Sequence, residues 1–147
     1  MNKIDMYDEQ TRLNLQTLVT LTRAEQKIHQ REYSTIKNKG ITVAQFGVLE
    51  ALYHKGDMKI CDIIDRILTT SGNITVVIKN LEKEGLVTKY IDPKDKRGVY
   101  VRITQKGIKI IDNIFPKHLE NINEIFNILT EDEKNMLISV LRKFRSI

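Results

Sequence analysis

The chain has 147 residues, of which 41% are hydrophobic and 29% are charged, and its formal net charge is +5. This balance is typical of one soluble globular unit. The single cysteine excludes an intrachain disulfide, and no apolar leader or run of about eighteen apolar residues is present. We therefore expect a cytoplasmic chain with no membrane-spanning segment.

The excess positive charge is concentrated in about a quarter of the sequence. Residues 71–110 contain nine basic and four acidic side chains, whereas the remaining residues contain fifteen of each. Such a basic segment is typical of proteins that bind a polyanion, nucleic acid above all. A protein that is basic by accident would carry its excess along the whole chain.

The first half of the chain predicts three helices. Residues 8–38 read as one long helix with a sparse apolar stripe. Thr42 and Gln45 have the spacing of a capping box, which opens a second helix that Gly56 closes. A third, short helix fits residues 60–68, where isoleucines recur on one face.

A fourth helix and a β-hairpin follow. Ser71 caps the expected helix 72–84, whose buried stripe consists of Ile74, Val77, Ile78 and Leu81. The apolar period then shortens from about 3.6 residues to 2, which predicts strands at 86–91 and 99–103. The polar segment 92–98 between them is rich in Asp, Pro and Gly and predicts a turn with a charged tip.

The C-terminal part predicts two more helices. Thr104 caps the first, whose apolar stripe spans 108–129, and Pro116 within it predicts a kink or a break. Thr130 and Glu133 form a second capping box. This box opens a last helix with four apolar side chains expected to face inward: Leu137, Val140, Leu141 and Phe144. The stripe over 108–129 is long for so small a domain and predicts a two-fold partner that covers it.

This order of elements predicts a mainly α fold with a small β-hairpin wing, a winged helix-turn-helix with long terminal helices. We expect one unit over residues 1–147. Within it, 42–104 would form a winged helix-turn-helix lobe that binds DNA, and 8–39 and 105–147 would form dimerisation helices.

Two surfaces of the lobe have the chemistry for duplex DNA. The helix 72–84 has a slim polar face without acidic residues in its first two turns, which suits the major groove. Asn can pair with adenine, Thr or Val can touch the thymine methyl group, and the helix N-terminus can hold a phosphate. The basic wing tip can reach phosphates or the minor groove. The candidate DNA-binding residues are Ser71, Gly72, Asn73, Thr75, Val76, Lys79, Lys94, Lys96 and Arg97.

Each surface alone has a plainer interpretation, a solvated helix face and a solubilising loop. Their adjacency in sequence, as in a recognition helix and a wing, favours DNA binding. Asp92 and Asp95 partly offset the charge of the tip, and we expect them to shape the turn and to orient Arg97.

The stretch TTSGNITVVIKNLEKEGLVTKYIDPKDKRGVYVRITQKG resembles the winged-helix region of MarR-family transcriptional regulators, and TVAQFGVLEAL resembles the helix that precedes it. The resemblance implies a homodimer with two recognition helices in successive major grooves and wings over the flanking minor grooves. It places Arg97 on the family's wing arginine and Asp95 on the acidic residue two before it. Lys96 stands where the family often has arginine, which removes a bidentate fork.

Four residues are candidates for sensing. Cys61 could respond to oxidants or electrophiles, although a small apolar core residue is the plainer interpretation. Tyr33, Phe46 and Tyr53 could line a pocket for a small aromatic effector, which the resemblance implies, or could be ordinary core. The three histidines are scattered, so we expect no metal and no cofactor.

These observations predict a sequence-specific regulator of transcription that binds a pseudo-palindromic site on double-stranded DNA, a repressor released by a small-molecule or redox effector. The alternative is a winged-helix adaptor that binds proteins and not DNA. An enzyme is not expected, because the sequence has no P-loop, GxSxG or HExxH motif.

Overall fold

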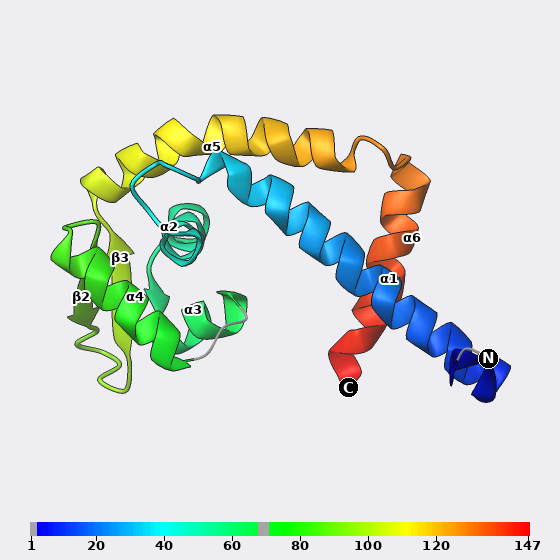
Figure 1. The fold of residues 1–147 in the computed structure, drawn as a ribbon. Coiled ribbons are helices and arrows are strands. Elements are labelled where there is room, and N and C mark those ends of the chain that lie inside the picture. Colours follow the sequence, from blue (N-terminus) through cyan, green and yellow to red (C-terminus); the bar gives the residue numbers. More distant parts are fainter. Residues whose placement is uncertain (1–2, 68–70) are drawn as a thin grey trace. The chain divides into compact units, whose positions relative to one another are not determined.

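A computed structural model describes residues 3–67 and 71–147 (Figure 1). The chain divides into two compact units, one built from residues 35–119 and the other from the segments that precede and follow them. The helix α5, Gln105–Phe126, belongs to both, since the division falls at residue 119. The sequence assigns all of 105–147 to dimerisation, and that role stays a prediction.

The unit 35–119 is a winged helix-turn-helix. Apart from β1, its helices and strands begin and end within one or two residues of their predicted positions. They are α2 Val43–Lys55, β1 Met58–Lys59, α3 Ile60–Ile67, α4 Ser71–Lys83, β2 Val87–Ile91, β3 Val99–Ile103 and the first part of α5. Figure 1 shows the hairpin of β2 and β3 beside α4.

The sheet has three antiparallel strands in the order β1-β3-β2. Tyr90 of β2 lies opposite Tyr100 of β3, and Lys59 of β1 pairs with the same Tyr100 from the other side. The sequence did not predict β1, because two residues are too few to show an alternation of apolar and polar positions. This short strand ties the segment before α3 to the wing.

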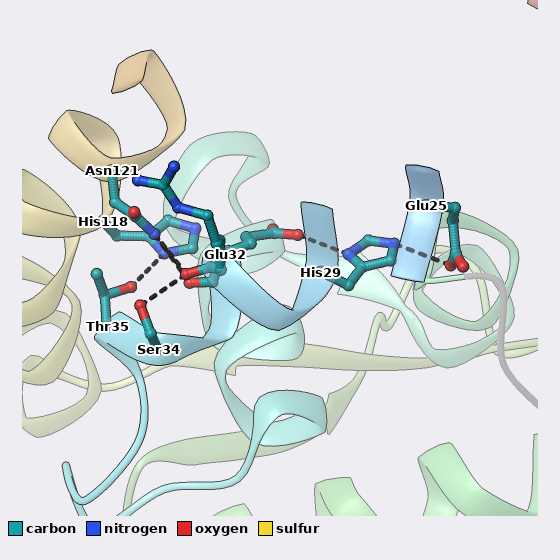
Figure 2. Close-up of polar contacts among 8 residues, drawn as sticks. Glu25, His29, Glu32, Ser34, Thr35, His118 and Asn121 are labelled. Atoms are coloured by element: carbon teal, nitrogen blue, oxygen red, sulfur yellow. Dashed lines mark hydrogen bonds and ion pairs between the residues drawn. The ribbon is translucent and has the colours of Figure 1, made fainter. Parts of the chain in front are cut away.

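The core of this unit is aliphatic. Its fully buried side chains include Val48, Leu49, Leu52, Ile63, Ile74, Ile78, Leu81, Leu86, Val87, Val101 and Ile111. Among the described residues, two polar side chains are buried with them, Gln45 and His118. The Nδ1 of His118 on α5 lies 2.8 Å from the Oγ1 of Thr35, a contact drawn in Figure 2, and its ring meets the edge of Phe46 at a centroid distance of 4.8 Å. A buried imidazole needs such a partner because an unpaired ring nitrogen would be costly.

The caps predicted for α2 and α5 are present, whereas Ser71, predicted to cap the next helix, is itself the first residue of α4. Thr42 accepts a hydrogen bond from the backbone N–H of Gln45, whose side chain accepts one from the backbone N–H of Thr42. Gly56 ends α2 with a positive φ of 80°, a conformation that favours glycine. Thr104 accepts from the backbone N–H of Gly107 at the start of α5 and donates to a backbone carbonyl before β2.

Of the kink or break expected at Pro116, the break does not occur, since α5 runs as one helix through this position, and a kink stays a prediction. A proline inside a helix leaves the carbonyl four residues earlier without its N–H partner. That residue is Asp112, and both Asp112 and Pro116 are solvent-exposed. Water can therefore satisfy the freed carbonyl, and the helix continues.

The second unit contains α1 Glu9–Glu32, the end of α5 and α6 Glu131–Arg142, which a capping box of Thr130 and Glu133 opens as predicted. The helix α1 ends earlier than expected, because the chain tightens into a 3-10 turn over Tyr33–Thr35. Asn121 donates a hydrogen bond of 2.7 Å to the carbonyl of Arg31 near this end. Figure 2 also shows His29 between Glu25 and Glu32, with ring nitrogen to carboxylate distances of 3.2 and 2.7 Å.

The apolar surface of the second unit differs from the expectation. The four side chains of the last helix that were expected to face inward are 39–53% exposed, whereas Ile111 and Ile125 of the stripe 108–129 are buried. Exposed apolar side chains gather on α1, on α6 and on the 3-10 turn Lys143–Ser146 that follows it. They line a groove of about 530 Å³ whose walls include Leu13, Leu21, Leu137, Val140, Leu141 and Phe144.

No helix within the described ranges 3–67 and 71–147 is both long and apolar enough to cross a bilayer.

Candidate nucleic-acid interface

The burial pattern of α4 is the one that the sequence predicts. Ile74, Val77, Ile78 and Leu81 are buried against the lobe. The opposite face exposes Asn73, Thr75, Val76, Lys79, Asn80 and Lys83, and the first turn has no acidic residue. Val76 is 56% exposed, an unusual position for a valine on a helix that already has a buried stripe. An exposed face of small polar, apolar and basic groups suits the edges of base pairs.

The start of α4 was also predicted to hold a phosphate. Ser71 and Gly72 lie in the first turn of the helix. Their side-chain surroundings, like residues 68–70, lie outside what the structure describes. The phosphate contact therefore stays a prediction.

The wing tip is an ordered turn with its basic groups outward. The backbone N–H of Lys94 donates to Oδ1 of Asp92 at 2.9 Å, and the N–H of Asp95 donates to the carbonyl of Asp92. The side chain of Arg97 is 92% exposed, and Lys94 and Lys96 are exposed as well. The expectation that the two aspartates shape the turn and orient Arg97 is confirmed, because Asp95 accepts from both the backbone N–H and the Nε of Arg97.

The sequence did not indicate a second partner of Asp95. Lys59 of β1 donates from Nζ to Oδ2 of Asp95 at 2.8 Å. This hydrogen bond is the main reason that the pKa of Asp95 lies below its ordinary value and that of Lys59 lies above it. No sequence signal marks this pair, since the two residues are 36 positions apart and Lys59 lies outside the basic segment.

A second network spans the sheet. Asp57 accepts hydrogen bonds from Arg102 and from the hydroxyl of Tyr90, both on its Oδ2, and the Arg102 guanidinium lies over the Tyr90 ring at 4.8 Å. The bond to Arg102 is the largest cause of the lowered pKa of Asp57, and the bond to Asp57 raises the pKa of Tyr90. Tyr90 also stacks on Tyr100. These contacts brace β2 and β3 against the segment before β1.

The candidate sensing residues lie in different surroundings. Cys61 is exposed, with Sγ 3.8 Å from a carboxylate oxygen of Asp62. Tyr33, in the unit of the terminal segments, stacks on His29. Phe46 is buried in the core of the other unit, where Tyr53 donates a hydrogen bond of 2.8 Å to Asp112. Their roles in sensing stay predictions.

Within the part of the chain that the structure describes, no group of three or more His, Cys, Asp or Glu side chains is placed to hold a metal ion.

Comparisons with known proteins agree on one family. The sequence model of the MarR family matches residues 41–99. The HTH-type transcriptional regulator MhqR of Bacillus subtilis is 37% identical over 133 residues, which is 90% of this chain and 92% of that protein. The structure of BpsR of Bordetella bronchiseptica, whose DNA binding is regulated by 6-hydroxynicotinic acid, aligns with a TM-score of 0.76 at 28% identity, over 88% of this chain and 98% of that one. The MarR-family regulator Sco3205 of Streptomyces coelicolor, solved in complex with DNA, aligns with a TM-score of 0.79 at 18% identity, over 89% and 84% of the two chains.

Proposed function

This chain belongs to the MarR family of transcriptional regulators, and we propose that it is a dimeric repressor that binds a pseudo-palindromic site on double-stranded DNA. Members of the family regulate transcription and are not enzymes. A role at the chromosome also implies the cytoplasm as its compartment.

One observation carries the proposal: α4 and the wing tip are two adjacent exposed surfaces whose chemistry suits different parts of a duplex. The helix exposes Asn73, Thr75 and Val76 for base edges and Lys79 for the backbone. The tip exposes Arg97, which a carboxylate holds in place. Base contacts supply specificity, and phosphate contacts supply most of the affinity.

The dimer is supported by the apolar groove between α1 and α6. Leu13, Leu137 and Phe144 are 40–61% exposed there, and so large an apolar surface on one unit is a liability unless a partner covers it. A second copy using the same surface would make a two-fold interface. Such a dimer would place its two recognition helices on half-sites about 10 bp apart.

Release by an effector is the finer part of the proposal. DNA binding by the related BpsR is regulated by 6-hydroxynicotinic acid, which is a small aromatic acid. An aromatic effector near Tyr33, Phe46 or Tyr53, or modification of the exposed Cys61, would change the spacing of the two recognition helices. Loss of half-site register would lower the affinity by a coupling free energy of about 1–3 kcal/mol.

The DNA-binding face is tested with the duplex that the wild-type protein selects from a randomised library. Arg97→Ala and Asn73→Ala should each weaken binding while the melting temperature stays unchanged, because both side chains are exposed. In Arg97→Ala, the log–log slope of affinity against salt should become shallower by about 0.9 for each phosphate that the arginine no longer neutralises. An adaptor without a DNA role would select no duplex, and unchanged affinity in both variants would exclude this face.

The dimer is tested by sedimentation velocity. Leu137→Glu places a charge in the groove and should give monomers. Ile128→Glu is the matched control, because Ile128 is 85% exposed and does not line that groove. A Leu137→Glu protein that sediments as the wild-type dimer would contradict the assigned interface.

A further inference from the structure

The carboxylate of Asp95 is shared between two cations. Its Oδ2 accepts from Lys59 Nζ at 2.8 Å, and its Oδ1 accepts from the backbone N–H and the Nε of Arg97 at 3.2 and 3.3 Å. Lys59 and Asp95 are less than one-third exposed, whereas Arg97 is 92% exposed. The chain Lys59–Asp95–Arg97 therefore connects a half-buried lysine in the sheet to an arginine at the solvent end of the wing.

Lys59 is itself held in place at three points. Its backbone pairs with Tyr100 of β3, and its Nζ lies 5.6 Å from the centre of the Tyr100 ring. Its methylene carbons run beside Gly98, where an added Cβ would lie only 3.1 Å from Cδ and 3.2 Å from Cε. The glycine after Arg97 thus leaves room for the lysine stem. A cation fixed in this way fixes the carboxylate that it binds.

On the premise that the protein binds DNA as proposed above, we propose that Lys59 is a positioning residue for the wing: it holds Asp95 so that Arg97 is presented to the DNA backbone. Lys59 also neutralises the carboxylate beside the arginine. Without that second cation, the whole negative charge of Asp95 would face Arg97 and would compete with phosphate for the guanidinium. Removal of Lys59 should therefore weaken binding by the wing, although Lys59 reaches the DNA only through the other two residues.

A different ion pair in the lobe provides a matched control. The Nζ of Lys89 on β2 lies 3.2 Å from Oε1 of Glu82 on α4. These two side chains are 35% and 40% exposed, somewhat more than Lys59 and Asp95 at 29% and 28%. Lys89→Met removes one positive charge from the same sheet, while the chain Lys59–Asp95–Arg97 stays intact. The control separates a loss of net charge from a loss of positioning.

The test measures affinity and salt dependence on the duplex selected by the wild-type protein. Lys59→Met should reproduce most of the loss of affinity caused by Arg97→Ala. It should also make the log–log slope of affinity against salt shallower by about 0.9 for each wing. Lys59→Arg should keep the wild-type affinity and the wild-type salt slope. In the Arg97→Ala background, Lys59→Met should cause no further loss, because the residue that it positions is gone. Lys59→Gln replaces Lys59→Met if the latter does not fold.

Three outcomes of the affinity measurements would overturn the proposal. They are equal losses of affinity from Lys59→Met and Lys89→Met, a loss in Lys59→Arg as large as in Lys59→Met, and a loss from Lys59→Met that is just as large in the Arg97→Ala background. A measurement without DNA distinguishes this failure from failure of the proposed function. Hydrogen exchange of the Arg97 backbone amide, which is bonded to Asp95, should be faster in Lys59→Met and unchanged in Lys89→Met. A protein that selects no duplex refutes the DNA role, and an unchanged exchange rate refutes the positioning.

Discussion

The exposed valine of the recognition helix predicts that the protein recognises thymine by its methyl group. Val76 is 56% exposed on the face of α4 that also presents Asn73 and Thr75. The C5-methyl of thymine is the one apolar group on base edges in the major groove, and apolar side chains recognise it by contact. Replacement of the contacted thymine by deoxyuridine removes that methyl and keeps the base pair.

The size of the effect follows from the apolar surface that the methyl group buries. A buried methyl or methylene group contributes about 0.8 kcal/mol. One thymine in each half-site of a two-fold complex gives about 1.6 kcal/mol, which is a loss of affinity of about 15-fold because each 1.4 kcal/mol is a factor of ten. The exposed half of the Val76 side chain is large enough to supply one such contact.

The assay is fluorescence anisotropy with the selected duplex, in which each symmetric pair of thymines is replaced in turn by deoxyuridine. At least one pair should weaken wild-type binding about 15-fold, and Val76→Ala should bind the thymine and uracil duplexes almost equally. Val43→Ala is the matched control, since Val43 is a 38% exposed valine at the start of α2. The reasoning is refuted if no thymine pair is sensitive, or if Val76→Ala remains as sensitive as the wild type.

Two further predictions concern stability and are measured by urea denaturation. Gly107→Ala should lower the free energy of unfolding by about 1–3 kcal/mol or more, because the new Cβ would lie 2.5 Å from the carbonyl oxygen of Leu86. Gly47→Ala, whose Cβ would meet nothing closer than 3.8 Å, should be neutral or stabilising, and equal effects would contradict this explanation. The bond from Arg102 lowers the pKa of Asp57 below 3.8, so this carboxylate stabilises the fold above that pH and the contribution is lost as the pH falls below it. The stability difference between wild type and Asp57→Asn should therefore be present near neutral pH and shrink below about pH 4, and a difference that persists in acid would exclude the ion pair as its source.

The parts of the fold that the sequence predicts depend on patterns between residues a few positions apart. The Thr42–Gln45 and Thr130–Glu133 capping boxes, the buried stripe of α4 and the alternation in β3 each depend on residues a few positions apart. The same locality extends to the wing, where Asp95 and Arg97 are two residues apart and their contact could be inferred. Both α4 and the wing tip were therefore visible in the sequence, and their contacts with DNA stay predictions.

The features that the sequence did not predict depend on contacts between residues far apart in the chain or between two molecules. Lys59 and Asp95 are 36 residues apart, and Asp57 and Arg102 are 45 apart, so no spacing pattern reveals either pair. The apolar stripe of α6 was recognised, but an amphipathic pattern shows only that a face is to be covered and not by what. Leu137 and Phe144 were for this reason assigned to an interior and are found at the surface.

The brevity of β1 has a consequence for solubility. An edge strand offers unpaired backbone groups on which another chain can build, and such edges lead to aggregation. One edge of this sheet is β1, whose two residues are too few to template a foreign strand. The opposite edge, β2, carries Lys89 at its centre, and a charged side chain on an edge strand discourages pairing with the edge of another sheet. The wing that we propose for DNA contact is thereby kept from pairing with the wings of neighbouring molecules.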